Sequence, residues 1–261
     1  MRPRAPRPGG VVLALLRRDL KVARREVSTI LAQGIMQPIF LLLVFGRVLT
    51  DLGLASAGYD DLLFPGMVAL AVVLTALQSS ALPLVMEFSV TREIEDRLMA
   101  PVSTTLVGIE KIVFAALRAL FAGVLMFPIG LLVLGGVPWR AAGLPLLAAA
   151  SVLGALAAAA FGMLLGTAIS PAQINIMFAL ILTPVLFTGC SQYPWPSLDR
   201  LPWFQVFTAA NPLTYFSEAM RAALVPAVPH LRPWISLLVL AATLVVVGGA
   251  ALRGFRRRAQ A

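Results

Sequence analysis

The chain has 261 residues, of which 59% are apolar and only 13% charged, and its mean hydropathy is +0.90. A soluble domain is roughly 45–50% apolar and about 25% charged, so this surplus excludes an ordinary soluble protein and predicts one membrane domain. The net charge of +9 gathers at the two ends of the chain, where eight basic residues precede Val27 and four follow Leu252. Basic ends that flank apolar spans are a topology signal, so we expect no nucleic-acid partner.

Cysteine and histidine each occur once, as Cys190 and His230. A single cysteine excludes an intrachain disulfide and a thiolate metal site, and a single histidine excludes a histidine metal cluster. No clustered histidine, cysteine or aspartate lies within an apolar span, as a membrane enzyme would require. We therefore expect no catalytic residues and no metal site.

The N-terminal region contains two segments. Residues 1–10 are rich in arginine and proline, and we expect a disordered basic tail. Apolar residues then recur at helical spacing beside basic ones, which predicts an amphipathic helix over residues 11–27 on the anionic inner leaflet. A plain basic cytoplasmic tail is the alternative. The apolar positions are Val12, Leu16, Leu20, Ala23 and Val27.

Six apolar segments follow within residues 28–252, and each is a candidate transmembrane helix. An even number of spans puts both basic ends on one side of the membrane, which the positive-inside rule identifies as the cytoplasm. Residues 253–261 would then form a basic cytoplasmic tail. The acidic loop Thr50–Asp61 has no Lys or Arg and would lie outside. The predicted spans are Ile30–Leu49, Leu62–Met86, Ile112–Gly135, Leu144–Ile169, Ile174–Gly189 and Trp234–Leu252.

The charged segment Glu87–Lys111 separates the second and third predicted spans on the cytoplasmic side. Residues Thr91–Met99 can form about two helical turns, with Ile94 and Leu98 on one face at i, i+4. Such a helix suits the docking of a soluble partner, and a solvated loop is the alternative.

A second unusual segment precedes the last span. Asn211 followed by Pro212 is a sound helix start, because Asn is a good N-cap and Pro fits the first helical position. The helix that follows, Leu213–Val225, is too short to span, and we expect a re-entrant element with Glu218 and Arg221 buried. These two residues are spaced i, i+3, so they can form an ion pair.

Other polar and small residues in the spans have two readings each. Arg118 lies about 10 Å from the start of its span, so we expect its side chain to extend to the nearer headgroups. A functional charge within the span is the alternative. A stripe of Ala158, Gly162 and Gly166 lets helices approach closely, within one subunit or between two. Four polar residues could line a pathway or form interhelical hydrogen bonds: Gln33, Gln37, Gln78 and Asn175.

Two motifs carry a family resemblance. One is the run Arg-Glu-Ile-Glu-Asp-Arg-Leu-Met-Ala-Pro-Val at 92–102, and the other is Asn-Pro-Leu-Thr-Tyr at 211–215, followed by Glu218 and Arg221. With these motifs the whole chain resembles the permeases of type-2 ABC transporters, which include the daunorubicin-resistance and nodulation-factor export permeases. The first motif departs from the common form, which carries Gly-Thr-Leu-Glu ahead of its Leu and Pro.

The resemblance implies an all-α integral membrane protein with six transmembrane helices, an N-terminal interfacial elbow helix, a cytoplasmic coupling helix and outer re-entrant helices before the last span. The coupling helix would contact the ATPase through Arg92, Glu93, Ile94, Glu95, Asp96, Arg97 and Leu98. The outer re-entrant region would include Asn211, Pro212, Tyr215, Glu218 and Arg221.

The implied function is that of the permease subunit of an ATP-driven exporter in the bacterial inner membrane, with both termini cytoplasmic. Its partners would be an ABC ATPase subunit, a second copy or a paralogous permease, and membrane lipid. The substrate would be an amphipathic drug, a lipid or a lipid-linked glycan.

The chain has no phosphate-binding loop of its own, because neither of its two lysines, Lys21 and Lys111, follows a Gly-rich loop. We therefore expect it to bind no cofactor, with ATP and Mg on the partner subunit. The alternatives are a secondary active transporter or a membrane scaffold subunit without an ATPase partner.

Overall fold

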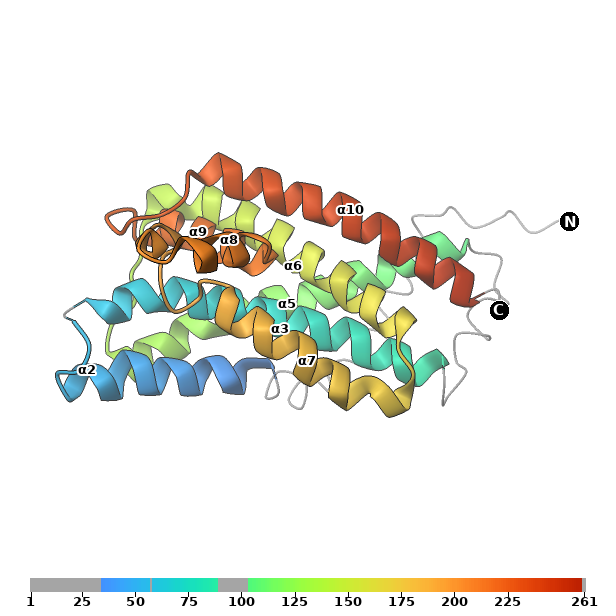
Figure 1. Cartoon of the computed structure of the whole chain (residues 1–261), viewed down its shortest axis with the longest axis horizontal. Coiled ribbons are helices and arrows are strands. Elements are labelled where there is room, and N and C mark those ends of the chain that lie inside the picture. Colours follow the sequence, from blue (N-terminus) through green and yellow to red (C-terminus); the bar gives the residue numbers. More distant parts are fainter. Residues whose placement is uncertain (1–33, 57, 89–102, 260–261) are drawn as a thin grey trace, which may run out of the picture.

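A computed structural model describes residues 34–56, 58–88 and 103–259 of the chain. The predicted elbow helix over residues 11–27 and the predicted coupling helix over residues 91–99 lie outside these ranges, as do the side chains of residues 171, 174, 175, 177 and 178. Within the described residues all regular structure is helical, and the long helices run along one common axis (Figure 1).

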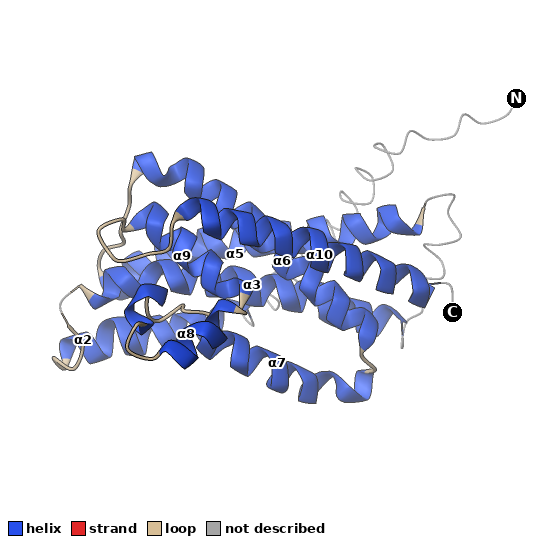
Figure 2. Ribbon diagram, turned by 45° about the horizontal axis from the view of Figure 1, so that its top comes forward, coloured by secondary structure: helices blue, strands red, loops and turns tan. Residues whose placement is uncertain are grey.

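The helices alternate in direction along this axis, as successive spans of a membrane protein do. The first described helix covers Gly34–Asp51 and includes a wider, π-helical stretch. Short helical turns join several of the longer elements, and the connections gather at the two ends of the bundle (Figure 2). The elements are η1 (Leu42–Val48), α2 (Leu49–Asp51), α3 (Tyr59–Met86), α5 (Thr104–Leu134), η3 (Ala141–Gly143), α6 (Leu144–Ala168), η4 (Pro171–Gln173), α7 (Ile174–Thr188), η5 (Trp195–Leu198), α8 (Pro202–Ala209), α9 (Pro212–Leu224) and α10 (Pro233–Ala259).

Five helices of the described residues are long and apolar enough to cross a membrane: Gly34–Asp51, α3, α5, the stretch Ala141–Ala168 that contains α6, and α10. The remaining predicted span, Ile174–Gly189, corresponds to α7, which has 15 residues. At 1.5 Å per residue α7 is about 22 Å long, shorter than the roughly 30 Å of a bilayer core. In the sequence α7 follows α6, and it leads the chain back to the end of the bundle where α6 begins.

Several helices extend beyond their predicted limits. Helix α3 begins at Tyr59 instead of Leu62, with Asp60 and Asp61 in its first turn. Carboxylates are favourable there because they face the positive end of the helix dipole. Helix α5 begins at Thr104, eight residues before the predicted start at Ile112, and so includes Glu110 and Lys111.

The C-terminal basic residues also differ from the prediction of a separate tail. Helix α10 continues without interruption past Leu252 to Ala259, and Arg256, Arg257 and Arg258 form its last turn. Cations are favourable at this position because they face the negative end of the helix dipole. Arg258 therefore has a fixed direction relative to the neighbouring helices.

Helix α3 lies at the centre of the bundle, and its residues from Leu63 to Leu77 are all buried. It packs closely against α6 because two glycines of α6 leave no side chain in the way. A Cβ added at Gly162 would lie 2.7 Å from the carbonyl oxygen of Leu77, and one at Gly166 would lie 2.9 Å from that of Ala81. The glycines of the predicted small-residue stripe thus serve packing within the chain.

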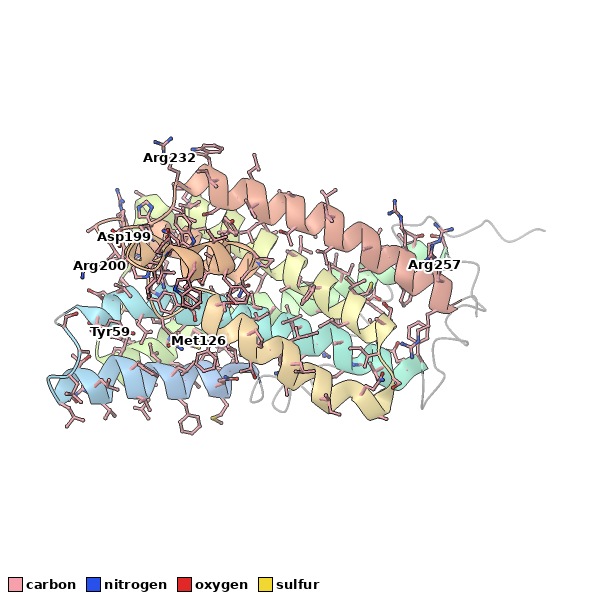
Figure 3. All side chains as sticks on the ribbon, viewed as in Figure 1. Tyr59, Met126, Asp199, Arg200, Arg232 and Arg257 are labelled. Carbon is pink, nitrogen blue, oxygen red and sulfur yellow. The ribbon has the colours of Figure 1, made fainter. Side chains whose placement is uncertain are left out.

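We name the two ends of the bundle after the elements that lie there. The α9 end holds α8, α9 and the starts of α3, α6 and α10, and the C-terminal end holds the last turn of α10 (Figure 1). Tyr59, Asp199, Arg200 and Arg232 lie at the α9 end, and Arg257 lies at the opposite end (Figure 3).

Candidate functional site

Asn211 starts α9 and also holds the end of α7. Its Oδ1 accepts a hydrogen bond from the backbone N–H of Leu213 at 2.9 Å, so it is the N-cap of α9, as predicted, with Pro212 at the first position. Its Nδ2 donates to the carbonyl oxygen of Val185 and to Oγ1 of Thr188, both at 2.9 Å. The side chain therefore uses its donors and its acceptor inside the protein, and it joins two helices.

The first turn of α9 also holds α8. The hydroxyl of Thr214 donates to the carbonyl oxygen of Thr208 at 2.7 Å, and that of Tyr215 donates to the carbonyl oxygen of Ala209 at 2.8 Å. The carbonyls at the end of a helix have no partner within the helix, so side-chain donors stabilise them. Helices α7, α8 and α9 are thus tied together by residues of one short motif.

Arg221 lies at the centre of the α9 end and is fully buried, with 0% exposure. Its Nη1 donates to Oε1 of Glu218 at 2.7 Å, and this confirms the ion pair expected from the i, i+3 spacing. Its Nη2 donates to the carbonyl oxygens of Cys190 at 2.6 Å and Ser191 at 3.0 Å, and its Nε to that of Leu62 at 3.3 Å. One guanidinium thus joins α9 to α3 and to the loop after α7.

Glu218, also fully buried, binds two further segments. Its Oε1 accepts a hydrogen bond from the backbone N–H of Trp195 at 3.0 Å, and its Oε2 accepts one from that of Leu231 at 2.8 Å. A buried ion pair is stable only when its remaining donors and acceptors are satisfied, and breaking such a pair costs about 3–5 kcal/mol. The Glu218–Arg221 pair meets this condition through backbone groups from both sides of α9.

Helix α3 crosses the loop after α7 at Gly66. A Cβ added at Gly66 would lie 1.8 Å from the carbonyl oxygen of Ser191, so only glycine allows this approach. The same carbonyl accepts a hydrogen bond from Arg221. The loop is therefore held between α3 and α9.

The α9 end contains a thiol but not a reactive one. Cys190 is fully buried in the loop after α7, with a backbone φ of 49°. Burial raises the pKa of this thiol from 9.0 to about 11, so the thiol is protonated at neutral pH. The nearby carboxylate of Glu218 accepts hydrogen bonds from Arg221 and from two backbone N–H groups. The site is suited to holding helices together.

The C-terminal end is held by a different set of contacts. Nζ of Lys111 on α5 lies 2.7 and 2.6 Å from the two carboxylate oxygens of Glu87, which follows α3. The side chains of Lys111 and Glu87 are 11% and 14% exposed. This pair joins α5 to the residue that follows α3.

Arg258 and Phe255 of α10 complete the C-terminal end. Nη1 of Arg258 lies within 2.9–3.1 Å of the carbonyl oxygens of Gly166, Thr167 and Ile169 at the end of α6. Its guanidinium also lies over the ring of Phe88, 5.0 Å from the centroid, and Phe255 packs edge-on against the same ring at 5.7 Å. The last turn of α10 therefore contacts both the end of α6 and the residues that follow α3.

The residues predicted to line a pathway do not form one group among the described side chains. Gln33 lies outside the described residues, and so does the side chain of Asn175 at the start of α7. Gln37 is exposed on the first helix. Gln78 is half-buried on α3, and its Oε1 is buried without a hydrogen-bond partner.

Arg118 lies on α5 with its guanidinium over the ring of Phe114, 4.5 Å from the centroid. Phe114 is one turn closer to the C-terminal end, because α5 starts there. The side chain therefore points toward the nearer end of its helix, in the direction that the sequence predicted.

The sequence did not predict the contacts of the Trp195–Gln205 pair, of Phe255 or of Arg258. Gln205 and Trp195 exchange two hydrogen bonds, since Nε1 of Trp195 donates to the carbonyl oxygen of Gln205 and Nε2 of Gln205 donates to that of Trp195. The roles of Phe255 and Arg258 were also missed. Their i, i+3 spacing is a signal that places both on one face of α10.

These observations define the class of the protein. Five helices of the described residues are long and apolar enough to cross a membrane, and one of them, α3, is buried among the others. The chain is a multi-pass membrane protein.

The family follows from its sequence. The family model of the ABC-2 type transporter matches residues 11–225, and the chain belongs to this family. It is the transmembrane permease domain of such a transporter. No curated protein matches the chain.

Proposed function

We propose that this chain is the permease subunit of an ATP-driven exporter, and that two permeases, identical or paralogous, form the pathway together. Membership of the ABC-2 type family over residues 11–225 carries this proposal. The full sequence adds that no Gly-rich phosphate-binding loop is present. Hydrolysis of ATP, with its Mg, would therefore take place on a separate ATPase subunit.

The C-terminal end of the bundle would face the bacterial cytoplasm. Twelve basic residues lie near the two termini, and the segment Thr50–Asp61 contains three Asp residues and no Lys or Arg. The α9 end would then face outward, and the described α9, with its buried ion pair, would be the outer re-entrant element. Helix α7 would be a further span beside the five long helices, and the loop that Arg221 binds would follow its short end.

The ATPase would bind through residues 91–99. This segment follows Glu87 and Phe88 and precedes α5 at the proposed cytoplasmic end. In a helix, Ile94 and Leu98 would lie on one face at i, i+4, and burying an aliphatic side chain contributes roughly 1.5–3 kcal/mol. The substrate would be an amphipathic drug, a lipid or a lipid-linked glycan, as in the permeases that the sequence resembles.

The test is reconstitution of the chain with and without a co-expressed ABC ATPase. The isolated chain should hydrolyse no ATP above background, and the pair should co-purify and export an amphiphile when ATP is added. Ile94→Asp with Leu98→Asp should prevent co-purification and leave membrane insertion intact. Charge reversal at Glu93 is the matched control, because an exposed i, i+4 pair contributes only about 0.3–0.5 kcal/mol. ATP hydrolysis by the isolated chain, or export by the double variant, would refute the proposal.

A further inference from the structure

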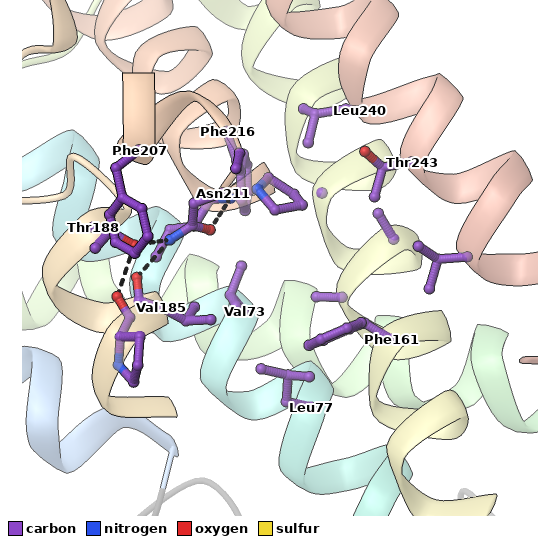
Figure 4. A pocket seen from close by; sticks show the side chains of 18 residues that line it. Val73, Leu77, Phe161, Val185, Thr188, Phe207, Asn211, Phe216, Leu240 and Thr243 are labelled. Atoms are coloured by element: carbon purple, nitrogen blue, oxygen red, sulfur yellow. Dashed lines mark hydrogen bonds between the residues drawn. The ribbon is translucent and has the colours of Figure 1, made fainter. Parts of the chain in front are cut away.

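A cavity of about 400 Å³ lies between two halves of the bundle, and we name it the α7–α10 slot (Figure 4). Helices α7, α8 and α9 form one wall, α6 and α10 form the other, and α3 forms the floor with Val73 and Leu77. The α6 wall is made of small residues, Gly154, Ala157 and Ala158, next to the ring of Phe161. The slot therefore has room because α6 carries almost no side chains there.

The slot lies at the depth of the bilayer interior. Leu240 and Val247 of its α10 wall are about 10 and 21 Å along the helix axis from Pro233. Gly154 and Phe161 of its α6 wall are about 15 and 26 Å from Leu144 by the same measure. The hydrocarbon core of a bilayer is about 30 Å thick, so the slot faces lipid tails and not headgroups.

The polar side chains along the slot have little to offer a polar ligand. Asn211 donates to Val185 and Thr188 and accepts from Leu213, and the hydroxyl of Thr188 itself donates to the carbonyl oxygen of Pro184 at 2.8 Å. A stable buried water needs two to four polar partners, and apolar cavities of this kind stay dry. Thr243 is the remaining polar side chain of the lining.

We propose that the α7–α10 slot binds a single hydrocarbon chain. The chain lies against Ala157, Ala158 and Phe161 and leaves its polar head beyond the slot. It comes either from a membrane phospholipid or from the tail of an exported amphiphile; only the second source rests on the proposed function. Both sources offer the same chemistry to the slot, and the experiment separates them.

The position of the slot gives the bound chain a structural role. In the described part of the chain, hydrogen bonds join α7 to α9 at its Thr188 end, through Asn211 and Thr214. At the same end of α7, Pro184, Val185 and Thr188 line the slot opposite α6 and α10. A chain in the slot therefore fills the space between this end of α7 and the wall that α6 and α10 form.

The test is photolabelling of the purified full chain, without an ATPase, in phosphatidylcholine nanodiscs. In the first arm a trace phosphatidylcholine carries a diazirine in mid-chain. In the second arm the lipid is unlabelled, and a single-chain alkyl glycoside carries the diazirine. Peptide mass spectrometry then locates the adducts. Adducts at Phe161 and Thr243 in the first arm identify a lipid chain, and adducts in the second arm that excess unlabelled glycoside suppresses identify an amphiphile tail.

Variants distinguish the slot from general contact with lipid. Ala158→Phe fills the slot and should lower the adducts at Thr243 at least tenfold, whereas the adducts at Val246, which is 70% exposed, should not change. Ala149→Phe makes the same substitution at an exposed position of α6 and should change neither. Val247→Trp fills the slot from the opposite wall, so a folded filling variant remains if Ala158→Phe does not fold. No adducts in the slot in either arm, or adducts that persist in a folded filling variant, would overturn the proposal.

Discussion

The two ends of the bundle are held together by polar contacts that differ in their access to water. At the α9 end, Glu218 and Arg221 are fully buried and bind only protein groups. At the C-terminal end, Lys111 and Glu87 keep 11% and 14% of their side-chain surface exposed. Separating the buried pair leaves two uncompensated charges, whereas the other pair can exchange its partner for water. We therefore expect the bundle to open more easily at the C-terminal end.

This difference agrees with the proposal that the C-terminal end binds the ATPase and that the α9 end faces outward. The segment proposed to bind the ATPase follows Glu87 and Phe88 in the sequence, and these two residues lie at the end with the partly exposed ion pair. Force from an ATPase would then act on the end that yields more easily. The α9 end would keep its internal arrangement during the same movement.

The largest loss of stability is expected for Arg221→Met. The variant leaves the Glu218 carboxylate buried without its partner, and breaking such a pair costs about 3–5 kcal/mol. Thermal or denaturant unfolding in detergent measures the change. Arg200→Met is the matched control at an exposed position of the same end and should change stability by less than about 0.5 kcal/mol.

A double variant sharpens this result. Glu218→Leu with Arg221→Met removes both charges, and replacing a whole buried pair by apolar residues is often close to neutral. The double variant should therefore be more stable than Arg221→Met alone. If it is less stable, the backbone contacts of the pair matter more than its charges.

A smaller loss is expected for Lys111→Met at the C-terminal end. The variant removes two charge-assisted hydrogen bonds, but Glu87 can then bind water, so we expect about 1–3 kcal/mol. The same unfolding experiment gives the value. A loss as large as that of Arg221→Met would show that the two ends are held equally and would remove the basis of the comparison.

Arg258→Ala should cost less again. The variant removes a cation from the end of α6 and from the ring of Phe88, and such contacts contribute about 0.5–1 kcal/mol each. Arg257→Ala removes the same charge from an exposed position one residue earlier and serves as the control. Equal stability of the two variants would show that the position of Arg258 against α6 is without effect.

The smallest effect is expected at Cys190, where burial raises the pKa of the thiol to about 11. At neutral pH the thiol is protonated in the folded and the unfolded chain, so its ionisation contributes nothing to a pH dependence. Between about pH 9 and 11 only the unfolded chain ionises, so stability should fall as the pH rises through this window.

Two measurements test this expectation. Iodoacetamide should leave Cys190 unmodified in the folded protein at pH 8 and modify it in denaturant. The alkaline loss should be smaller in Cys190→Ala than in the unchanged chain. Rapid modification of the folded protein at pH 8 would contradict the burial of this loop.

The sequence predicted the features of the α9 end that depend on neighbouring residues. The Asn211 cap and the Glu218–Arg221 pair lie within one helix, so helical spacing alone brings their atoms together. Arg221 also binds Leu62 and Cys190, which are 159 and 31 residues away in the chain. No local pattern encodes these partners, because they depend on how whole helices pack.

The C-terminal end was harder to predict for the same reason. Apolar spacing identified α5 and α10 but placed their ends at the nearest charges, Lys111 and Arg253, because charge is unfavourable in lipid. Both helices continue past these residues, since Lys111 finds Glu87 and Arg258 finds the end of α6. The α7–α10 slot was not predicted either, because its lining comes from six helices that are far apart in the sequence.

The close approach at Gly66 has a mechanical consequence for α3. A screw movement of α3 by one residue would bring Pro65 or Met67 against the carbonyl of Ser191, where there is no room for a side chain. We therefore expect α3 to move by tilting about this crossing. Gly66 lies seven residues from Tyr59 and twenty from Met86, so a rigid tilt moves the Met86 end about three times as far as the Tyr59 end. A small tilt at the α9 end of α3 would therefore produce a larger displacement at its Met86 end.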